Sequence, residues 1–246
     1  MVSKEALIFL NRIKSFDEDL ELVDVLKIAL SHNNLLKKDG CLFKYVNETK
    51  HVNLYNRKAT IQSRKIVINH LRKTVYSSYF KDLYEELTGY LKALLSEAAK
   101  VSKDKEKARR LMGEHTINMK ASDILQFNSI EDLARYIAES IIQSLENERS
   151  TKELIKKVCN KIDLQIDDKI INDALPYLEI RHKLVHANGL LDDEFKASYP
   201  QIQCDSDSFI VLNQPLVNSA KNAITALVMA IDEKALKKSL LSPNTI

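Results

Sequence analysis

The chain has 246 residues with only 4 glycines and 4 prolines, and its formal net charge is +3, which by itself indicates no class of partner. Backbone amides cradle a phosphate where several glycines lie close together. The four glycines are far apart, so a glycine-rich nucleotide loop is excluded. Hydrophobic content of 45% and charged content of 29% are typical of a soluble globular protein. With no apolar run near the ~20 residues of a membrane span and no signal-peptide pattern, we expect a cytoplasmic protein.

Long helices are expected in the first half of the chain, because proline is absent before Pro176 and glycine is rare. The scarcity of both residues predicts an all-α helical bundle. Helices are predicted over residues 3–38, with a break near Ser15–Asp19 left open, and over about 60–100. Leucines spaced by three or four positions form the predicted buried stripe of the second helix. They are Leu83, Leu87, Leu91 and Leu94 or Leu95.

Capping signals organise the second half of the chain. They predict helix starts at Ser129, Ser150 and Asp167. Pro176 suits the first turn of a fresh helix over 176–188, and Gly189 suits the position just past its end. A short β-hairpin or strand is expected near 205–213, followed by a last helix over 217–237.

Two regions are predicted along the chain. Residues 1–56 form an N-terminal helical region, either separate or packed on the same core, and residues 57–246 form the main helical domain. Three widely spaced cysteines, Cys41, Cys159 and Cys204, give neither a disulfide framework nor a zinc site. Cys159 and Cys204 have no histidine nearby in sequence, so both are expected to be buried structural thiols.

The helix that ends before Gly189 carries the densest group of chemically active side chains. Arg181, His182, Lys183 and His186 lie within six residues. Histidine exchanges a proton near neutral pH, and arginine grips phosphate oxygens with two parallel hydrogen bonds. A proton carrier beside a fixed cation is what cleavage of a phosphodiester requires.

The segment 181–186, Arg-His-Lys-Leu-Val-His, resembles the R-x4-6-H motif of the HEPN superfamily. The continuation through Gly189 into an acidic loop, a short strand and a final helix is similar to the RiboL-PSP-type branch of that superfamily. The resemblance covers residues 60–237 as a helical layout and is sharp only from 178 to 190. It implies a four-helix core, often dimeric, with the motif in a cleft between subunits.

Many HEPN members are metal-independent endoribonucleases of toxin–antitoxin or phage-defence systems. The resemblance therefore implies RNA as substrate, a homodimer, an antitoxin or defence-system partner protein, and no cofactor. By carry-over, Arg181 would bind the scissile phosphate, His186 would act as general acid and base, and His182 would orient the site or contact RNA. Lys183 and Asn188 are the expected RNA contacts beside the motif. The 2′-hydroxyl of RNA would attack and leave a 2′,3′-cyclic phosphate.

Two other functions compete with the ribonuclease. Some HEPN members lack activity and bind a nucleotide, RNA or a partner protein. A metalloprotein is the third hypothesis, because Glu179, His182 and His186 share one helix face at i, i+3 and i+7. Against a metal, the neighbouring Arg181 and Lys183 would repel a cation.

A basic segment, residues 57–81, contains seven lysines and arginines and no acidic residue. Basic pairs seven or eight residues apart share a helix face that could track an RNA backbone. The expected RNA contacts are Arg64, Lys65, Arg72 and Lys73. Tyr76, Tyr79 and Phe80 follow them as candidates for base stacking. An ordinary solvated helix face is the alternative.

Overall fold

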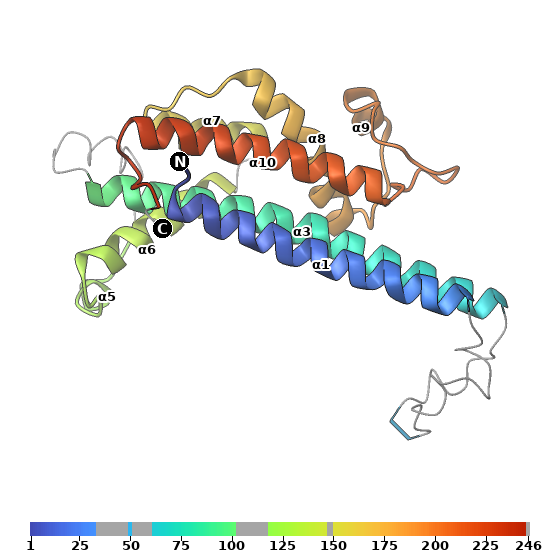
Figure 1. Ribbon diagram of the computed structural model, residues 1–246. Coiled ribbons are helices and arrows are strands. Elements are labelled where there is room, and N and C mark those ends of the chain that lie inside the picture. Colours follow the sequence, from blue (N-terminus) through green and yellow to red (C-terminus); the bar gives the residue numbers. More distant parts are fainter. Residues whose placement is uncertain (33–48, 51–60, 102–117, 147–149, 245–246) are drawn as a thin grey trace. The chain divides into compact units, whose positions relative to one another are not determined.

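The computed structural model describes residues 1–32, 49–50, 61–101, 118–146 and 150–244. Within these ranges the chain is predominantly helical and contains no β-sheet, which confirms the all-α prediction (Figure 1). None of the described helices combines the length and the apolar character needed to cross a membrane.

The chain divides into two compact units. One comprises Met1–Ile13 together with Phe80–Ile246, and the other is Lys14–Tyr79. The long helices α1 (Lys4–His32) and α3 (Ile61–Val101) each contribute residues to both units. The domain boundary predicted at residue 56 falls among residues 51–60, outside the described ranges.

Within the smaller unit, aromatic packing joins the two long helices. The rings of Phe16 and Tyr79 meet edge to face, with centroids 6.1 Å apart. The Tyr79 hydroxyl donates to Asp17 at 3.4 Å, and burial together with this carboxylate raises the tyrosine's pKa. Helix α1 continues unbroken through residues 15–19, so the break left open there does not form.

The leucine stripe predicted for α3 is confirmed in the larger unit. Leu83, Leu87, Leu91, Leu94 and Leu95 are at most 2% exposed. Gly89, on the same helix, is exposed and has nothing near the position of a side chain, so it marks no close helix contact.

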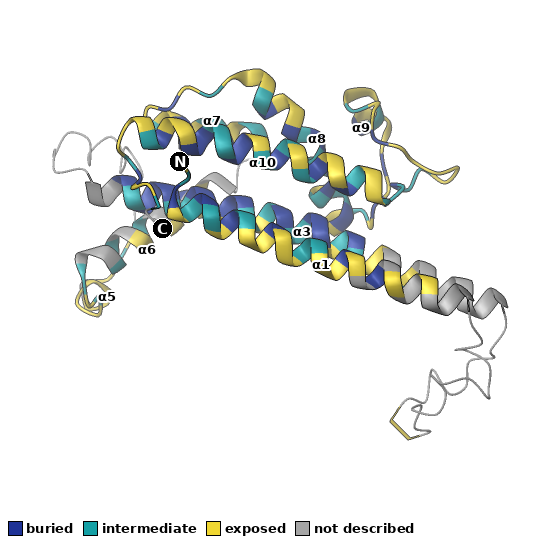
Figure 2. Ribbon diagram, viewed as in Figure 1, coloured by how far each residue is buried: buried dark blue, intermediate teal, exposed yellow. Residues whose placement is uncertain are grey.

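Six further helices follow in the described part of the chain. They are α5 (Ala121–Ile124), α6 (Ile130–Glu146), α7 (Thr151–Lys161), α8 (Asp168–His186), α9 (Asp193–Ser198) and α10 (Gln214–Lys237). Three of them, α6, α7 and α8, begin where the capping signals predicted. Ser129, Ser150 and Asp167 each accept a backbone N–H in the first turn of α6, α7 and α8. Helix α8 packs against α7 and α10, and buried residues line both α8 and α10 (Figure 2).

The prediction that Pro176 begins a helix is wrong, because it lies inside α8. Proline in a helix interior removes one backbone hydrogen bond and costs about 3 kcal/mol. Here Pro176 is itself buried, and so are its neighbours Leu178 and Ile180 on two sides of the helix. Burial of one such side chain contributes about 1.5–3 kcal/mol, so packing offsets the lost hydrogen bond and the helix runs through.

A buried carboxyl group ties the first helix to the last. Asp232 of α10 is 0% exposed and accepts hydrogen bonds from the Ser3 N–H at 3.0 Å, the Ser3 hydroxyl and the Tyr90 hydroxyl at 3.3 Å. The Ser3 hydroxyl in turn accepts the Ala6 N–H at 3.0 Å and so caps α1. Burial and the neighbouring Asp232 raise the pKa of Tyr90. We call Ser3, Tyr90 and Asp232 the Asp232 network.

Of the cysteines, Cys159 is buried as predicted, and burial raises its pKa to about 12. A thiol that stays protonated at neutral pH is a poor nucleophile, which fits a structural role. Cys204 is exposed, so the buried position expected for it is wrong, and Cys41 lies outside the described residues.

Candidate functional site

The motif occupies the last turns of α8, where the backbone leaves the helix in a tight C-terminal turn. The N–H groups of Ala187 and Gly189 both donate to the carbonyl of Lys183, at 3.0 and 2.9 Å. Asn188 and Gly189 follow with positive φ angles of 50° and 86°. This turn ends α8 at His186, two residues before the predicted end at Asn188, and leaves Val185 and His186 exposed.

His182 and His186 lie one helical turn apart and face each other. Their ring centroids are 4.5 Å apart, with the planes tilted by 46°. Both side chains are exposed, and neither imidazole has a hydrogen-bond partner among the described residues. The ring nitrogens are therefore accessible from solvent, as a group that transfers protons requires.

Arg181 points to a different neighbour. Its guanidinium carbon lies 4.8 Å from the ring centroid of Tyr84 on α3. In the described part of the chain it forms no ion pair and no hydrogen bond or cation–π contact with either histidine. A guanidinium stacked on an aromatic face keeps its N–H edge for hydrogen bonds. Arg181 therefore remains able to grip an oxyanion from this position.

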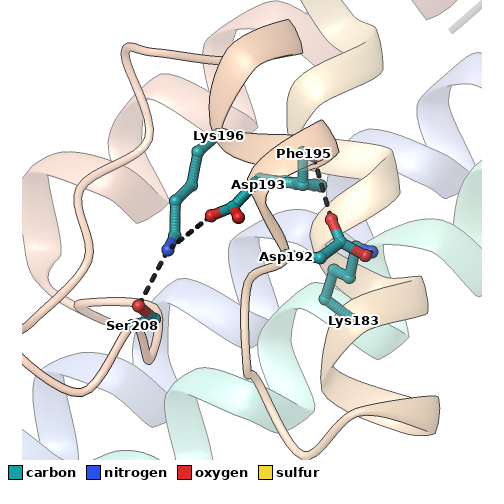
Figure 3. A network of polar contacts seen from close by, with 6 residues as sticks. All are labelled: Lys183, Asp192, Asp193, Phe195, Lys196 and Ser208. Atoms are coloured by element: carbon teal, nitrogen blue, oxygen red, sulfur yellow. Dashed lines mark hydrogen bonds and ion pairs between the residues drawn. The ribbon is translucent and has the colours of Figure 1, made fainter.

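Lys183 connects the motif to α9, as Figure 3 shows. Its ammonium lies 2.5 Å from Asp192 and 5.6 Å from the ring centroid of Phe195. Asp192 also accepts the Phe195 N–H at 2.9 Å and so begins α9. The Lys183 hydrogen bond, followed by that of Phe195, lowers the pKa of Asp192. Lys183 thus anchors the segment after the motif.

Part of the acidic loop expected after Gly189 forms the short helix α9. A hydrogen bond connects this helix to the turn around Ser208. Lys196 binds the Ser208 hydroxyl at 2.8 Å and Asp193 at 3.5 Å (Figure 3). The expected strand or hairpin takes the form of isolated antiparallel bridges, Leu190 with Phe209 and Cys204 with Ile210. This segment therefore lies against the residues directly after the motif.

The basic segment 57–81 is described only in part. The side chains of Arg64, Lys65 and Arg72 lie outside the described residues, and Lys73 is exposed. The proposed base-stacking role of three aromatic residues is wrong. Tyr76, Tyr79 and Phe80 are 6%, 2% and 1% exposed, because they pack in the cores of the units.

The three-ligand metal site considered for Glu179, His182 and His186 is not formed. Across the described residues, no group of three or more histidine, cysteine or acidic side chains is arranged to hold a metal. Glu179 is half-buried, and the pKa of Tyr199 is raised by its own burial and then by the nearby charge of Glu179.

Two residues that contact the motif, Asp192 and Tyr84, were not predicted from the sequence. Asp192 carries the signature of a helix N-cap followed by two acidic residues, so its role could have been predicted. Tyr84 had no local signal, because its contact with Arg181 joins two helices far apart in sequence.

Replacing Gly189 with alanine is expected to lower the free energy of unfolding by about 1–2 kcal/mol, the cost of a left-handed backbone for a residue with a Cβ. The φ of 86° is unfavourable for alanine, and the new Cβ would lie 3.4 Å from Leu184 Cδ2. Gly89→Ala is the matched control, because that helical position has open space. It should raise stability by about 0.5–1 kcal/mol. Urea denaturation measures both, and equal shifts would contradict the assigned turn.

Comparisons with protein-family models, with curated proteins and with solved structures give no significant match to this chain. The HEPN resemblance therefore stays a prediction.

Proposed function

We propose that the protein is a metal-independent endoribonuclease of the HEPN type, with its active site on the last turns of α8. One observation carries the proposal: His182 and His186 face each other at 4.5 Å with both rings exposed, on the same turns as Arg181, whose guanidinium is in no ion pair among the described residues. Proton carriers and a fixed cation on one exposed helix end suit phosphodiester cleavage.

In the proposed reaction, His186 takes the proton from the RNA 2′-hydroxyl as its oxygen attacks the adjacent phosphorus. The bond from phosphorus to the 5′-oxygen breaks, and His182 in its protonated form gives that oxygen a proton. Arg181 binds the phosphate oxygens, where negative charge increases in the transition state. The products are a 2′,3′-cyclic phosphate and a 5′-hydroxyl, so atoms and protons balance without a metal.

A second proposed copy of the chain would complete the site. Val185 and Leu190 are 44% and 45% exposed beside the histidines. Apolar side chains at such positions are typical of an interface, and a dimer through this face would place two motifs together. The same surface favours the second candidate function, a non-catalytic module that binds a partner protein there.

The deciding experiment incubates the purified chain with single-stranded RNA in the presence of EDTA and identifies the RNA ends. Cleavage that yields 2′,3′-cyclic phosphates is the expected result, and RNA with a 2′-deoxy residue at the cleaved position should resist. Intact RNA under all conditions would overturn the catalytic proposal and favour the binding module. Cleavage abolished by EDTA would contradict the metal-independent mechanism.

A further inference from the structure

The two histidines of α8 also form the geometry of a metal chelate. They are four residues apart on one exposed helix face, with ring centroids 4.5 Å apart. Two histidines at this spacing on a helix are a known arrangement for binding zinc. Neither ring is engaged in a hydrogen bond within the described chain, so ring nitrogens of both are available as ligands.

The distances fit one shared ion. Zinc binds histidine nitrogen at about 2.0–2.1 Å in tetrahedral geometry, which places two ligand nitrogens about 3.4 Å apart. Ring nitrogens lie on the rims of the imidazoles, so a centroid spacing of 4.5 Å requires only small rotations of the side chains to reach this separation. A helical turn holds both residues in place, and little entropy is lost on binding.

The charges around the pair oppose a cation less than the sequence suggests, although Arg181 keeps its positive charge. Lys183, which would repel a metal, is neutralised by Asp192 at 2.5 Å. Arg181 is directed to the ring of Tyr84. Glu179 lies one turn before His182 on the same helix and adds negative charge. The electrostatic objection drawn from the sequence is therefore weaker in the folded protein.

The site has two protein ligands. Since no larger metal-binding group occurs among the described residues, water would fill the remaining positions of a zinc ion. Such a site binds reversibly and is not that of a resident cofactor, because structural and catalytic zinc sites use four or three protein ligands.

We propose that His182 and His186 together chelate a divalent transition-metal ion such as zinc, and that the bound ion inhibits RNA cleavage. Metal occupies the nitrogen lone pairs that proton transfer requires. The inhibition rests on the proposed ribonuclease function, whereas the binding does not.

Isothermal titration calorimetry of the metal-free 246-residue chain with ZnCl2 tests the site directly. His182→Gln and His186→Gln should each weaken binding at least about tenfold, since loss of even an outer-shell partner costs 10–100-fold. His70→Gln is the matched control, because His70 is an exposed histidine elsewhere on a helix, and it should bind like the unaltered chain. Circular dichroism verifies that each variant is folded. Absence of saturable binding, or unchanged affinity in either α8 variant, would overturn the proposal.

The two proposals fail separately. Zinc that stops RNA cleavage with the midpoint found by titration supports both binding and inhibition. Full cleavage at saturating zinc would overturn the inhibition. Zinc binding that depends on both histidines, in a protein that cleaves no RNA without metal, would support the metal site and overturn the ribonuclease.

Discussion

Replacing His186 with alanine is expected to slow RNA cleavage by about 10²–10⁴-fold, the usual contribution of a positioned general acid or base. The reason is that the 2′-hydroxyl would have to lose its proton to water. The side chain is exposed at the end of α8, so the substitution should leave the fold intact. Single-turnover cleavage of a labelled RNA, with folding verified by circular dichroism, measures the effect.

Companion variants separate the roles within the motif. His182→Ala should remove the fall in rate at high pH, because His182 in its protonated form gives the leaving 5′-oxygen its proton. Arg181→Lys should lower the rate while keeping the charge, because lysine cannot grip phosphate with two parallel hydrogen bonds. His70→Ala is expected to cleave at the unaltered rate. Equal activity of His186→Ala and the unaltered enzyme would refute the assigned site.

Replacing Asp232 with alanine is expected to lower the free energy of unfolding by about 3–5 kcal/mol, among the larger effects of single substitutions. The substitution leaves the Ser3 N–H, the Ser3 hydroxyl and the Tyr90 hydroxyl without their acceptor in the core. It also loosens the cap of α1, because the Ser3 hydroxyl that accepts the Ala6 N–H loses its own partner. Urea denaturation with an unchanged m-value measures this loss.

Tyr90→Phe is the control for the Asp232 network. It removes one donor and leaves the carboxyl group with two, so it should cost only about 0.5–1.5 kcal/mol. Glu233→Ala, at the exposed neighbouring position paired with Lys237, should change stability by less than about 0.5 kcal/mol. A loss of the same size in Asp232→Ala and Glu233→Ala would show that the buried network contributes nothing.

The sequence predicted those elements whose cause is local. Ser129, Ser150 and Asp167 cap helices with their own side chains, and the leucines of α3 repeat at helical spacing, so short windows contained the needed information. Pro176 shows the limit of this reasoning. Its local preference for a helix start was overridden by its burial in a helix that packs against α7 and α10.

The candidate site was predicted in part for the same reason. The four-residue spacing of His182 and His186 determines that they share a helix face, and the structure adds their orientation. The stacking of Arg181 on Tyr84 and the burial of Tyr76, Tyr79 and Phe80 depend on how helices pack. The basic and aromatic residues of segment 57–81 therefore predicted a surface for stacking RNA bases. In the folded protein these aromatic side chains are instead buried in the cores of the units.

The Asp232 network has a consequence for the order in which the protein matures. Its hydrogen bond from Ser3 to Asp232 spans 229 positions. The Ser3 N–H at the start of α1 therefore has no acceptor until α10 has been synthesised. Helix α8, which bears the motif, also packs on α10. On the ribosome, the first helix and the motif helix therefore reach their final environment at nearly the same late moment, and a chain stopped before α10 has neither in place.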